Sequence, residues 1–258
     1  MVTNQKIFFY SSSNSPIFKH SKIDFIITSK NYGFSTHDFS SLNLGYHTGD
    51  AYINVSKNRN KICKLFYPKK PLLWLNQIHS DLIITHIKPG TSLYQTGDSL
   101  ICKSKKIKAM IMVADCVPVC IFDSKNNVFA LIHAGRLGLF QKIISKTIIE
   151  MSKIFSTKSK DLLAYIGPCI HPCCYEVDAK ILLQTKQLFK NDFENFVIEH
   201  NQKFFLNLPA MAKFQLTDFG ISGSNIEISP TCTFEEENLF SYRRNNKTGR
   251  FALIASLK

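Results

Sequence analysis

The sequence predicts a globular fold in which β-strands and α-helices interleave without the strict alternation of a doubly wound sheet. Its 258 residues are 45% hydrophobic and 20% charged, a composition that is far from disorder in a chain long enough to bury a sizeable core. Short apolar runs of strand length are interspersed with segments whose apolar residues recur at helical spacing. We expect a single domain that spans residues 1–258.

Seven apolar runs have the length and residue types of strands, and several are short enough to lie inside a sheet. They are Ile23–Thr28, Leu72–Leu75, Leu82–Ile87, Ala109–Val113, Val117–Phe122, Val128–Ile132 and Leu162–Ile166. A short strand is also predicted at Lys203–Leu206. The Ser/Asn-rich segment Ser11–Ser15 is interpreted as a surface turn.

Three segments are predicted to be helices. The clearest is Leu139–Phe155, in which large apolar residues recur every three or four positions and charged residues occupy the other side. Asp178 is a candidate N-cap for a second helix that runs to about Phe189. Pro209–Phe219 follows the last predicted strand and begins with a residue that favours the first turn of a helix.

The charge pattern argues against nucleic-acid binding. The net charge of +13 comes almost entirely from lysines spread along the chain, without a run of five basic residues. Such a distribution indicates a solvated basic surface rather than a phosphate-binding face. The first ten residues lack the apolar core of an export signal, and no apolar stretch approaches the roughly 20 residues needed to span a bilayer. We therefore expect a cytoplasmic protein whose eight cysteines are free thiols or metal ligands.

Three potential metal ligands each follow a predicted strand. His79 ends the segment LLWLNQIH, Cys116 ends AMIMVADC, and His133 ends VFALIH. Because strand ends gather at one rim of a sheet, these side chains can converge although they are far apart in sequence. Imidazole and thiolate suit Zn²⁺, and three protein ligands leave one position open, as in catalytic sites. The alternative is a small buried cysteine and two hydrogen-bonded imidazoles without a metal.

Neighbouring residues point to anion binding. The segment AGRLG after His133 leads into a predicted helix, whose N-terminal N–H groups favour an anion. Asp115 is interpreted as a group that orients a ligand, and capping of a turn explains it equally well. Near the C-terminus, Arg243 and Arg244 follow an aromatic residue, and Arg250 comes shortly after. Such arginines suit phosphate or carboxylate binding, whereas an exposed pair on a loop is the alternative.

Together these segments identify a family resemblance that covers nearly the whole chain. The matching strings are SLNLG with HTGD and NR, NQIHS, VADCVPV, IHAG, IGPCI with CCYEV, and CTF with LFSYRR and GR. They resemble the family variously called YfiH-like, laccase-domain or multicopper polyphenol oxidase-like proteins. The resemblance implies an α+β fold with mixed β-sheets packed between helices in four layers. It also implies that His79, Cys116 and His133 are metal ligands.

The activity that the resemblance implies is phosphorolysis of purine nucleosides. Adenosine, inosine and methylthioadenosine are split to the base and the sugar 1-phosphate, with adenosine deamination as a second activity. The expected cofactor is Zn²⁺, with Cu²⁺ as an alternative. The expected small-molecule partners are purine nucleosides and phosphate, and the protein is expected to be a monomer. Phosphorolysis needs a cation to hold phosphate, and Arg59 is our first choice. Further candidates for binding substrate or phosphate are Arg243, Arg244, Asn43, Lys30 and Arg136.

Two departures from the family pattern bear on the substrate. Relatives usually have His-Ala-Gly-Trp-Arg-Gly where this chain has HAGRLG, so Arg136 supplies the charge from one position earlier. Lys30 stands in TSKNYGFS, where relatives tend to have Arg, and a point charge therefore replaces a bidentate fork.

Three other functions use the same residues. A copper oxidase of phenols needs several coppers and many histidines, and the chain has eight scattered histidines with one coherent set. A cysteine hydrolase acting on cell-wall precursors would use Cys116 as its nucleophile and a histidine as base. A binding protein with a decayed active site is suggested by the HAGRLG departure.

Overall fold

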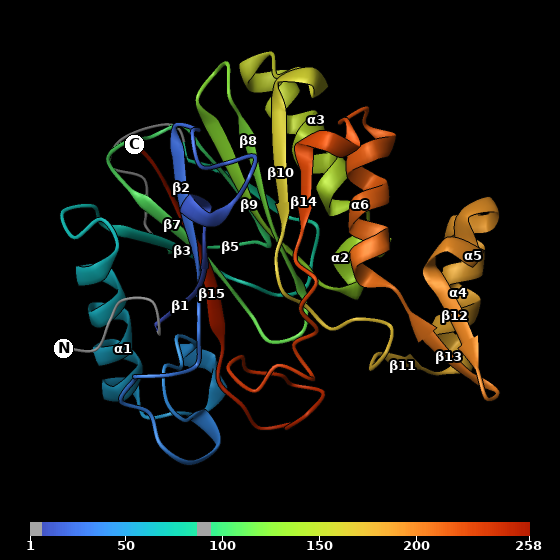
Figure 1. Cartoon of the computed structure of the whole chain (residues 1–258), viewed down its shortest axis with the longest axis horizontal. Coiled ribbons are helices and arrows are strands. Elements are labelled where there is room, and N and C mark those ends of the chain that lie inside the picture. Colours follow the sequence, from blue (N-terminus) through green and yellow to red (C-terminus); the bar gives the residue numbers. More distant parts are fainter. Residues whose placement is uncertain (1–6, 87–93) are drawn as a thin grey trace.

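The computed structural model describes residues 7–86 and 94–258, and these residues form four layers (Figure 1). Two six-stranded mixed sheets pack face to face in the middle. Helix α1 (Tyr52–Leu65) covers the outer face of one sheet. The outer face of the other is covered by α2 (Arg136–Phe140), α3 (Ile143–Phe155) and α6 (Leu208–Asp218). The predicted α+β fold with mixed sheets between helices is confirmed.

The first sheet has the order β1-β2-β15-β7-β3-β5. Its strands in this order are β1 (Phe8–Ser11), β2 (Ile23–Thr28), β15 (Phe251–Leu257), β7 (Lys108–Val113), β3 (Leu72–Asn76) and β5 (Tyr94–Thr96). The four strands from β1 to β7 pair antiparallel, whereas β7, β3 and β5 pair parallel. The C-terminal strand β15 therefore lies in the interior of the sheet, between β2 and β7.

The second sheet has the order β14-β10-β8-β9-β6-β4. Its strands in this order are β14 (Ile226–Ile228), β10 (Leu162–Ile166), β8 (Val117–Asp123), β9 (Val128–Ala134), β6 (Ser99–Cys102) and β4 (Ile83–His86). The hairpin β8–β9 is central to it, with every residue from Val117 to Asp123 paired. Of the strand predicted at Leu82–Ile87, the last residue lies outside the described residues.

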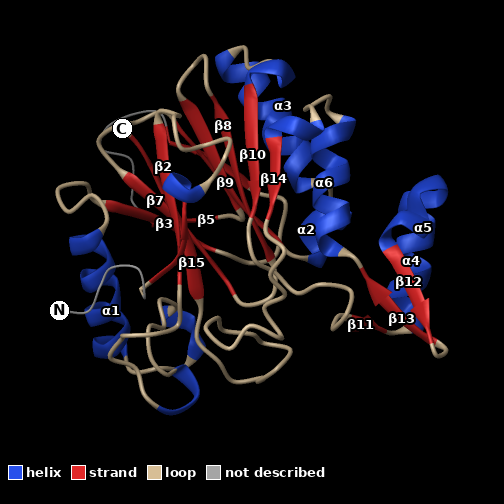
Figure 2. Ribbon diagram, in the orientation of Figure 1, coloured by secondary structure: helices blue, strands red, loops and turns tan. Residues whose placement is uncertain are grey.

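A smaller unit projects beside these layers, at the right in Figure 2. It contains the sheet β11 (Glu176–Val177), β13 (Lys203–Leu206) and β12 (Val197–His200), together with α4 (Ala179–Phe189) and α5 (Phe193–Phe196). Asp178 caps α4 as predicted, because its side chain accepts a hydrogen bond from the N–H of Ile181. Short 3₁₀ turns occupy Ser12–Asn14, His37–Phe39, Tyr46–Thr48, Ser159–Asp161, Lys190–Asp192 and Gly223–Asn225.

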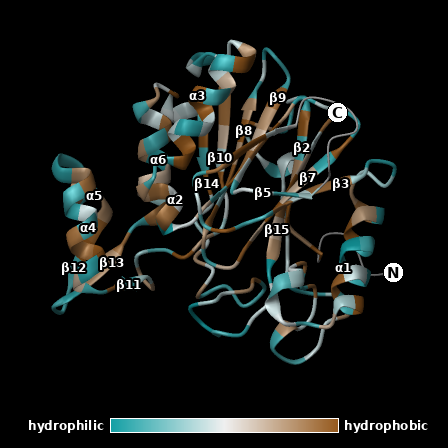
Figure 3. Ribbon diagram, turned by 180° about the vertical axis from the view of Figure 1, so that it is seen from behind, coloured by the Kyte–Doolittle hydropathy of each residue, from teal (hydrophilic) through white to brown (hydrophobic). Residues whose placement is uncertain are grey.

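Both faces of the central strands are buried, which explains their continuous apolar runs. In β9, Ala130 and Ile132 belong to the core beneath the helices, whereas Phe129 and Leu131 belong to the core between the sheets. His133 continues the second set, because side chains alternate along a strand. The strands are largely brown in Figure 3, and hydrophilic residues colour the outer sides of the helices. His133 is thus presented at the end of the layer between the two sheets.

The predicted continuous helix Leu139–Phe155 is wrong, because the chain forms two helices. Lys142 separates them in the left-handed region, with φ of 59°. The buried side chain of Gln215 in α6 fills the break. Its amide N–H donates to the carbonyl of Leu139 at 2.8 Å, and its Oε1 accepts from the N–H of Ile144 at 3.2 Å. Gln215 therefore satisfies two backbone groups that a continuous helix would have paired internally.

The segment Ser11–Ser15 forms the predicted turn, with Ser13 and Asn14 exposed, but only part of it lies on the surface. Ser12 and Ser15 are buried rather than on the surface. The hydroxyl of Ser12 accepts the N–H of Phe25, and the hydroxyl of Ser15 donates to Glu227. The segment thus contacts β2 of the first sheet and β14 of the second sheet. Within the described ranges, no helix is long and apolar enough to cross a membrane.

Candidate metal centre

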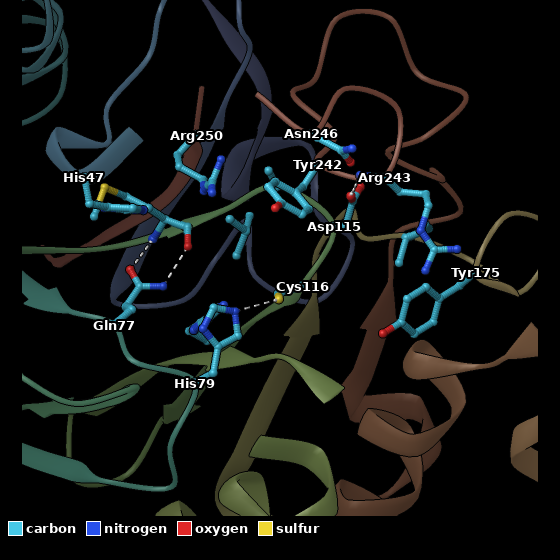
Figure 4. A pocket seen from close by; sticks show the side chains of 15 residues that line it. His47, Gln77, His79, Asp115, Cys116, Tyr175, Tyr242, Arg243, Asn246 and Arg250 are labelled. Carbon is cyan, nitrogen blue, oxygen red and sulfur yellow. Dashed lines mark hydrogen bonds between the residues drawn. The ribbon is translucent and has the colours of Figure 1, made fainter. Parts of the chain in front are cut away.

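The structure brings His79, Cys116 and His133 together at one end of the two sheets. One donor atom from each lies within 4.8 Å of the others, and Nε2 of His79 is 3.7 Å from Sγ of Cys116 (Figure 4). The two imidazole rings meet nearly edge to face, with centroids 4.8 Å apart. His79 is exposed, Cys116 is half-buried and His133 is buried. The predicted convergence of the three side chains is therefore observed.

The three residues come from three different backbone settings. His133 lies within β9, Cys116 directly precedes β8, and His79 lies three residues beyond the end of β3. Pro118 pairs with His133 across the hairpin, so Cys116 reaches the same end of the sheet. The side chain of Gln77 joins the third segment, since it makes two hydrogen bonds, of 2.7 and 2.8 Å, with the backbone of Met112.

Asp98, which the sequence analysis missed, holds two of the three ligands. Its Oδ1 lies 2.8 Å from Nδ1 of His133. The same carboxylate accepts backbone N–H groups of Ile78, His79 and Ser80, and also the hydroxyl of Ser80. Asp98 is fully buried, and burial alone would raise its pKa. The hydrogen bonds from His133 and Ser80 outweigh burial and lower the pKa to about 2.

Gly135 gives the cluster the space it needs. A Cβ atom at this position would lie 2.9 Å from Sγ of Cys116 and 3.1 Å from Cδ2 of His79. The first separation is shorter than side-chain Cβ atoms tolerate, so any larger residue would displace the ligands. The backbone of Gly135, with φ of −71°, is open to any residue. Glycine is therefore required here for the close approach of the ligands and not for its backbone conformation.

Asp115 joins the Cys116 loop to the C-terminal loop. Its Oδ1 accepts the hydroxyl of Thr233 and its Oδ2 accepts the N–H of Arg243, both at 2.6 Å. Its φ of 92° lies in the left-handed region, as does that of His79 at 58°. Such backbone conformations are costly for residues other than glycine and persist where surrounding contacts fix them. The hydrogen bonds that the carboxylate of Asp115 accepts, and the one that the N–H of His79 donates to Asp98, supply those contacts.

The metal-free cluster favours a thiolate beside an imidazolium. Burial would raise the pKa of Cys116, but the neighbouring His133 and His79 lower it to about 6. Burial would likewise lower the pKa of His133, but Cys116 and Asp98 raise it to about 9. Each partner therefore stabilises the charged form of the other. The thiolate is also the form of cysteine that binds metals.

These donors fit a zinc ion. Ligands bound 2.0–2.3 Å from a tetrahedral zinc ion are about 3.3–3.8 Å apart, and the 3.7 Å between Nε2 of His79 and Sγ of Cys116 falls in this range. Because Asp98 holds Nδ1 of His133, the other ring nitrogen is the one available to a cation. Three protein ligands leave a position for a fourth group.

A cavity of about 610 Å³ opens over the cluster. Its size is in the range of about 300–1,000 Å³ found for small-molecule sites. The side chains that line it include the following polar and aromatic residues: His47, Gln77, His79, Asp115, Cys116, His133, Tyr175, Tyr242, Arg243, Asn246 and Arg250. Figure 4 shows Arg250 and Arg243 on opposite sides of Tyr242.

Of the predicted anion-binding residues, Arg243 lines the cavity, as does Arg250, seven positions further along the chain. The guanidinium of Arg243 donates to the carbonyls of Cys174 and Glu176 through Nη1 and lies 4.8 Å from the ring centre of Tyr175. Nη1 of Arg250 donates to the carbonyls of Thr248 and Gly249. Among the described residues, no hydrogen bond occupies Nε or Nη2 of either arginine.

Arg59 lines a different, neighbouring cavity of about 300 Å³. Its guanidinium lies 4.1 Å from the ring centre of Tyr46 and 4.9 Å from that of Trp74. Nε donates to the carbonyl of Leu44 and Nη2 to the sulfur of Met112. Nη1 is buried and has no partner in the described part of the chain. With 6% of its surface exposed, Arg59 offers little of its charge to phosphate.

The other candidates lie outside the lining of the metal cavity. Lys30 and Arg244 line a third cavity, and Arg244 donates to four backbone carbonyls in the C-terminal loop. Asn43 is buried and uses its side chain within its own loop and for the N–H of Arg250. Arg136 lies over Phe140 at 5.5 Å. Burial raises the pKa of Tyr175, and the charge of Arg136 opposes this effect.

Several residues of the site were not singled out from the sequence. Gln77, Tyr175 and Tyr242 lie within the strings NQIHS, CCYEV and LFSYRR, whereas Asp98 and Asn246 belong to none of the strings that carry the resemblance. His47 had a signal, because it belongs to the HTGD string that helped to establish the resemblance. It lines the metal cavity, and burial together with Arg250 and Arg59 lowers its pKa.

The fold and the site define a class of protein: two mixed sheets between helices, with a His/Cys/His cluster that could hold a metal ion where the sheets end. The chain belongs to the family described as multi-copper polyphenol oxidoreductase laccase, whose model matches residues 24–258. A purine nucleoside phosphorylase from Haemophilus influenzae is 32% identical over 231 residues, 88% of this chain and 91% of the relative. Purine nucleoside phosphorylase YfiH from Escherichia coli is 30% identical over 223 residues, covering 85% and 88%.

Solved structures agree with this assignment. The crystal structure of the hypothetical protein YfiH from Bacillus licheniformis matches with a TM-score of 0.87 at 26% identity, covering 95% of this chain and 98% of that one. YlmD from Geobacillus stearothermophilus matches with a TM-score of 0.85 at 25% identity, covering 95% and 94%. The whole four-layer arrangement is therefore shared with the family.

Proposed function

We propose that this protein is a metal-dependent purine nucleoside phosphorylase. One observation carries the proposal: a single cavity contains three metal donors on one side and the arginines Arg243 and Arg250 on the other. The names of the relatives from Haemophilus influenzae and Escherichia coli support the same activity. The proposed substrates are adenosine, inosine and methylthioadenosine, and the products are the base and the sugar 1-phosphate.

In this reaction a phosphate oxygen forms a bond to C1′ of the sugar while the bond from C1′ to the purine nitrogen breaks. The departing base takes the bonding electron pair and must be protonated. Arg250 and Arg243 are suited to hold the phosphate dianion, since guanidinium groups bind phosphate through paired N–H donors. Tyr175 and Tyr242 offer ring faces for the purine. Arg250 replaces Arg59 as our first choice because it lines the cavity that contains the metal donors.

Zn²⁺ is the proposed cofactor, and it would supply a Lewis acid that makes water nucleophilic near neutral pH. That chemistry also suits the proposed deaminase side activity, in which water replaces the C6 amino group of adenosine and ammonia leaves. Asp98 orients His133 by holding its Nδ1, so that Nε2 would be the nitrogen that binds the cation. A multicopper centre would need further histidine clusters, and in the described residues only one metal-competent cluster contains histidine.

The test is product analysis. Purified protein is offered adenosine, inosine and methylthioadenosine with and without phosphate, and sugar 1-phosphate is measured. We expect His79→Ala, Cys116→Ala and His133→Ala each to abolish phosphate-dependent base release. Normal release by any one of these variants in the folded state would overturn the proposal, as would products that lack phosphate.

A cysteine hydrolase is the second candidate, because the thiolate of Cys116 lies against two imidazoles. Metal content separates the two functions. Loss of one zinc equivalent in Cys116→Ala favours a ligand, whereas a covalent Cys116 adduct in active, metal-free protein favours a nucleophile.

A further inference from the structure

Three cysteines and one glutamate gather on two turns beside the metal cavity. Donor atoms from all four lie within 4.8 Å of one another: Cys173, Cys174, Cys232 and Glu235. The lining of the cavity, as far as the described residues define it, does not include them. Cys173 and Glu235 are exposed and Cys232 is buried, so the cluster has one closed side and one side open to solvent.

Each turn contributes two of these four side chains to the cluster. In the first turn, the N–H groups of Cys174 and Tyr175 both donate to the carbonyl of His171 at 3.0 Å, and Sγ of Cys173 lies 3.4 Å from Sγ of Cys174. In the second turn, the N–H of Glu236 donates to the carbonyl of Cys232 at 3.0 Å. Cys232 and Glu235 are therefore the first and fourth residues of one five-residue turn.

The two turns are fixed to each other. Cys232 forms a parallel β-bridge with Cys169, and the N–H of Thr233 donates to the carbonyl of Cys169. The N–H of His171 donates to Sγ of Cys232 at 3.4 Å. A backbone donor directed at sulfur stabilises a thiolate, the form that binds metals.

Two consecutive arginines hold the turns from outside. Arg243 donates to the carbonyl of Cys174 at 3.3 Å. Arg244 donates to the carbonyls of Thr233, Phe234 and Glu236, at 2.8 to 3.3 Å. The backbone of both turns is thus held in place by two arginines from outside the cluster.

We propose that these residues form a second metal site, which binds one Zn²⁺ through four protein ligands: Cys173, Cys174, Cys232 and Glu235. Thiolate sulfurs bound to tetrahedral zinc are about 3.8 Å apart, so the 3.4 Å between Cys173 and Cys174 needs only a small adjustment. The same distance is far beyond the 2.05 Å of a disulfide bond, and all three thiols are free.

The second site differs in kind from the first. Four protein ligands close the coordination shell, which is the pattern of structural zinc, whereas the His/Cys/His set leaves a position open. The closed shell would stabilise the loop that reaches the cavity. Thr233 and Arg243, which hold Asp115 beside Cys116, follow Cys232 in this loop. This inference does not depend on the phosphorylase activity.

The experiment counts zinc ions. The full chain is purified under reducing conditions, stripped of metal and titrated with Zn²⁺ against a chromogenic chelator. We expect two equivalents in the native sequence and one in the His79→Ala/Cys116→Ser variant. Adding Cys173→Ser and Cys174→Ser to that variant should remove the remaining equivalent. Cys63→Ser, which changes a thiol in α1, is the matched control and should leave the count unchanged.

Cobalt substitution provides a second measurement if the combined variants fail to fold. In the otherwise native sequence, Cys173→Ser alone changes an exposed side chain and should reduce the thiolate-to-cobalt charge-transfer absorption. Glu235→Gln should weaken zinc binding at this site by at least about tenfold, as expected when a group that supports metal binding is lost.

The proposal is overturned if the His79→Ala/Cys116→Ser variant binds no zinc while folded, or if the equivalent that it binds survives Cys173→Ser and Cys174→Ser. Binding of Cu⁺ without Zn²⁺ would also overturn it.

Discussion

The carboxylate of Asp98 joins His133 to His79. Its Oδ1 lies 2.8 Å from Nδ1 of His133 and 3.0 Å from the backbone nitrogen of His79, and both ligands are thereby fixed by one buried group. Asp98 directly precedes Ser99, the first residue of β6. A single side chain thus determines which ring nitrogen of His133 faces the cation and where the His79 loop begins.

Asp98→Asn should therefore weaken zinc binding without removing a ligand. Loss of such an outer partner typically lowers metal affinity about 10–100-fold, and we expect an effect of this size in competition with a chelator. Asp123→Asn is the matched control, because Asp123 is also buried and also accepts backbone N–H groups, but at the opposite end of β8. Equal affinities in the two variants would contradict the role of Asp98.

Gly135→Ala should disturb the same centre by steric contact. The added methyl group would lie 2.9 Å from Sγ of Cys116, so the thiolate must move from its position beside His79. We expect zinc affinity to fall by about tenfold or more, similar to the loss of an outer partner. Gly223→Ala adds a methyl group that meets nothing within 4 Å and should have no effect. Unchanged zinc binding in Gly135→Ala would contradict the steric contact between an added methyl group and Cys116.

The metal set and the central strands could be predicted from sequence because their signals are local. Val117–Phe122 and Val128–Ile132 are apolar without interruption, since both faces of each strand are buried, and the candidate ligands follow such runs. The C-terminal strand Phe251–Leu257 is just as apolar and as buried, and it was not predicted. Helix α1 was missed for a different reason, because only four of its fourteen residues are buried and its sequence is rich in Asn and Lys.

The remaining site residues could not be predicted because their roles depend on tertiary contacts. Nothing near Asp98 in the sequence indicates that it meets His133, which is 35 positions away. Arg59 was expected to hold phosphate because of its charge and its motif. Its position between Tyr46 and Trp74 depends on how α1 packs on the first sheet. A sequence motif therefore indicates that an arginine suits anion binding, but it does not indicate which cavity that arginine lines.

In the metal-free protein, the reactivity of Cys116 should persist to unusually low pH. Its pKa of about 6 lies below the ordinary value, so the thiolate is present above about pH 6 and is lost below it. Alkylation by iodoacetamide, followed by peptide mass spectrometry, should be nearly constant from pH 7 to 9 and fall steeply below pH 6. Burial raises the pKa of Cys102 to about 12, and this thiol should stay unmodified in the same samples. An alkylation rate for Cys116 that keeps rising through pH 8 would contradict the thiolate.

Gln215→Leu should destabilise the fold at the break between α2 and α3. Leucine has a similar volume but leaves the N–H of Ile144 without its partner, whereas the carbonyl of Leu139 keeps the N–H of Lys142. An unsatisfied buried group costs about 1–3 kcal/mol, so we expect the free energy of unfolding to fall by about 1–3 kcal/mol in urea titrations. Gln187→Leu, on the exposed side of α4, is the control. A Gln215→Leu protein as stable as the control would mean that the helix break does not depend on this side chain.

Arg250→Gln should weaken the use of phosphate more than the use of nucleoside. Arg250 lines the metal cavity with Nε and Nη2 unoccupied by hydrogen bonds from the described residues, whereas Arg59 is enclosed by two aromatic rings. Loss of one hydrogen bond to a charged group costs about 1.5–3 kcal/mol, which corresponds to a rise of about 10–100-fold in KM for phosphate. Arg59→Gln is the comparison and should change KM for phosphate by less than about twofold, because the Arg59 guanidinium is buried against two aromatic rings in the neighbouring cavity. The opposite order of effects would place phosphate in the neighbouring cavity and would return Arg59 to the role that its sequence motif suggested.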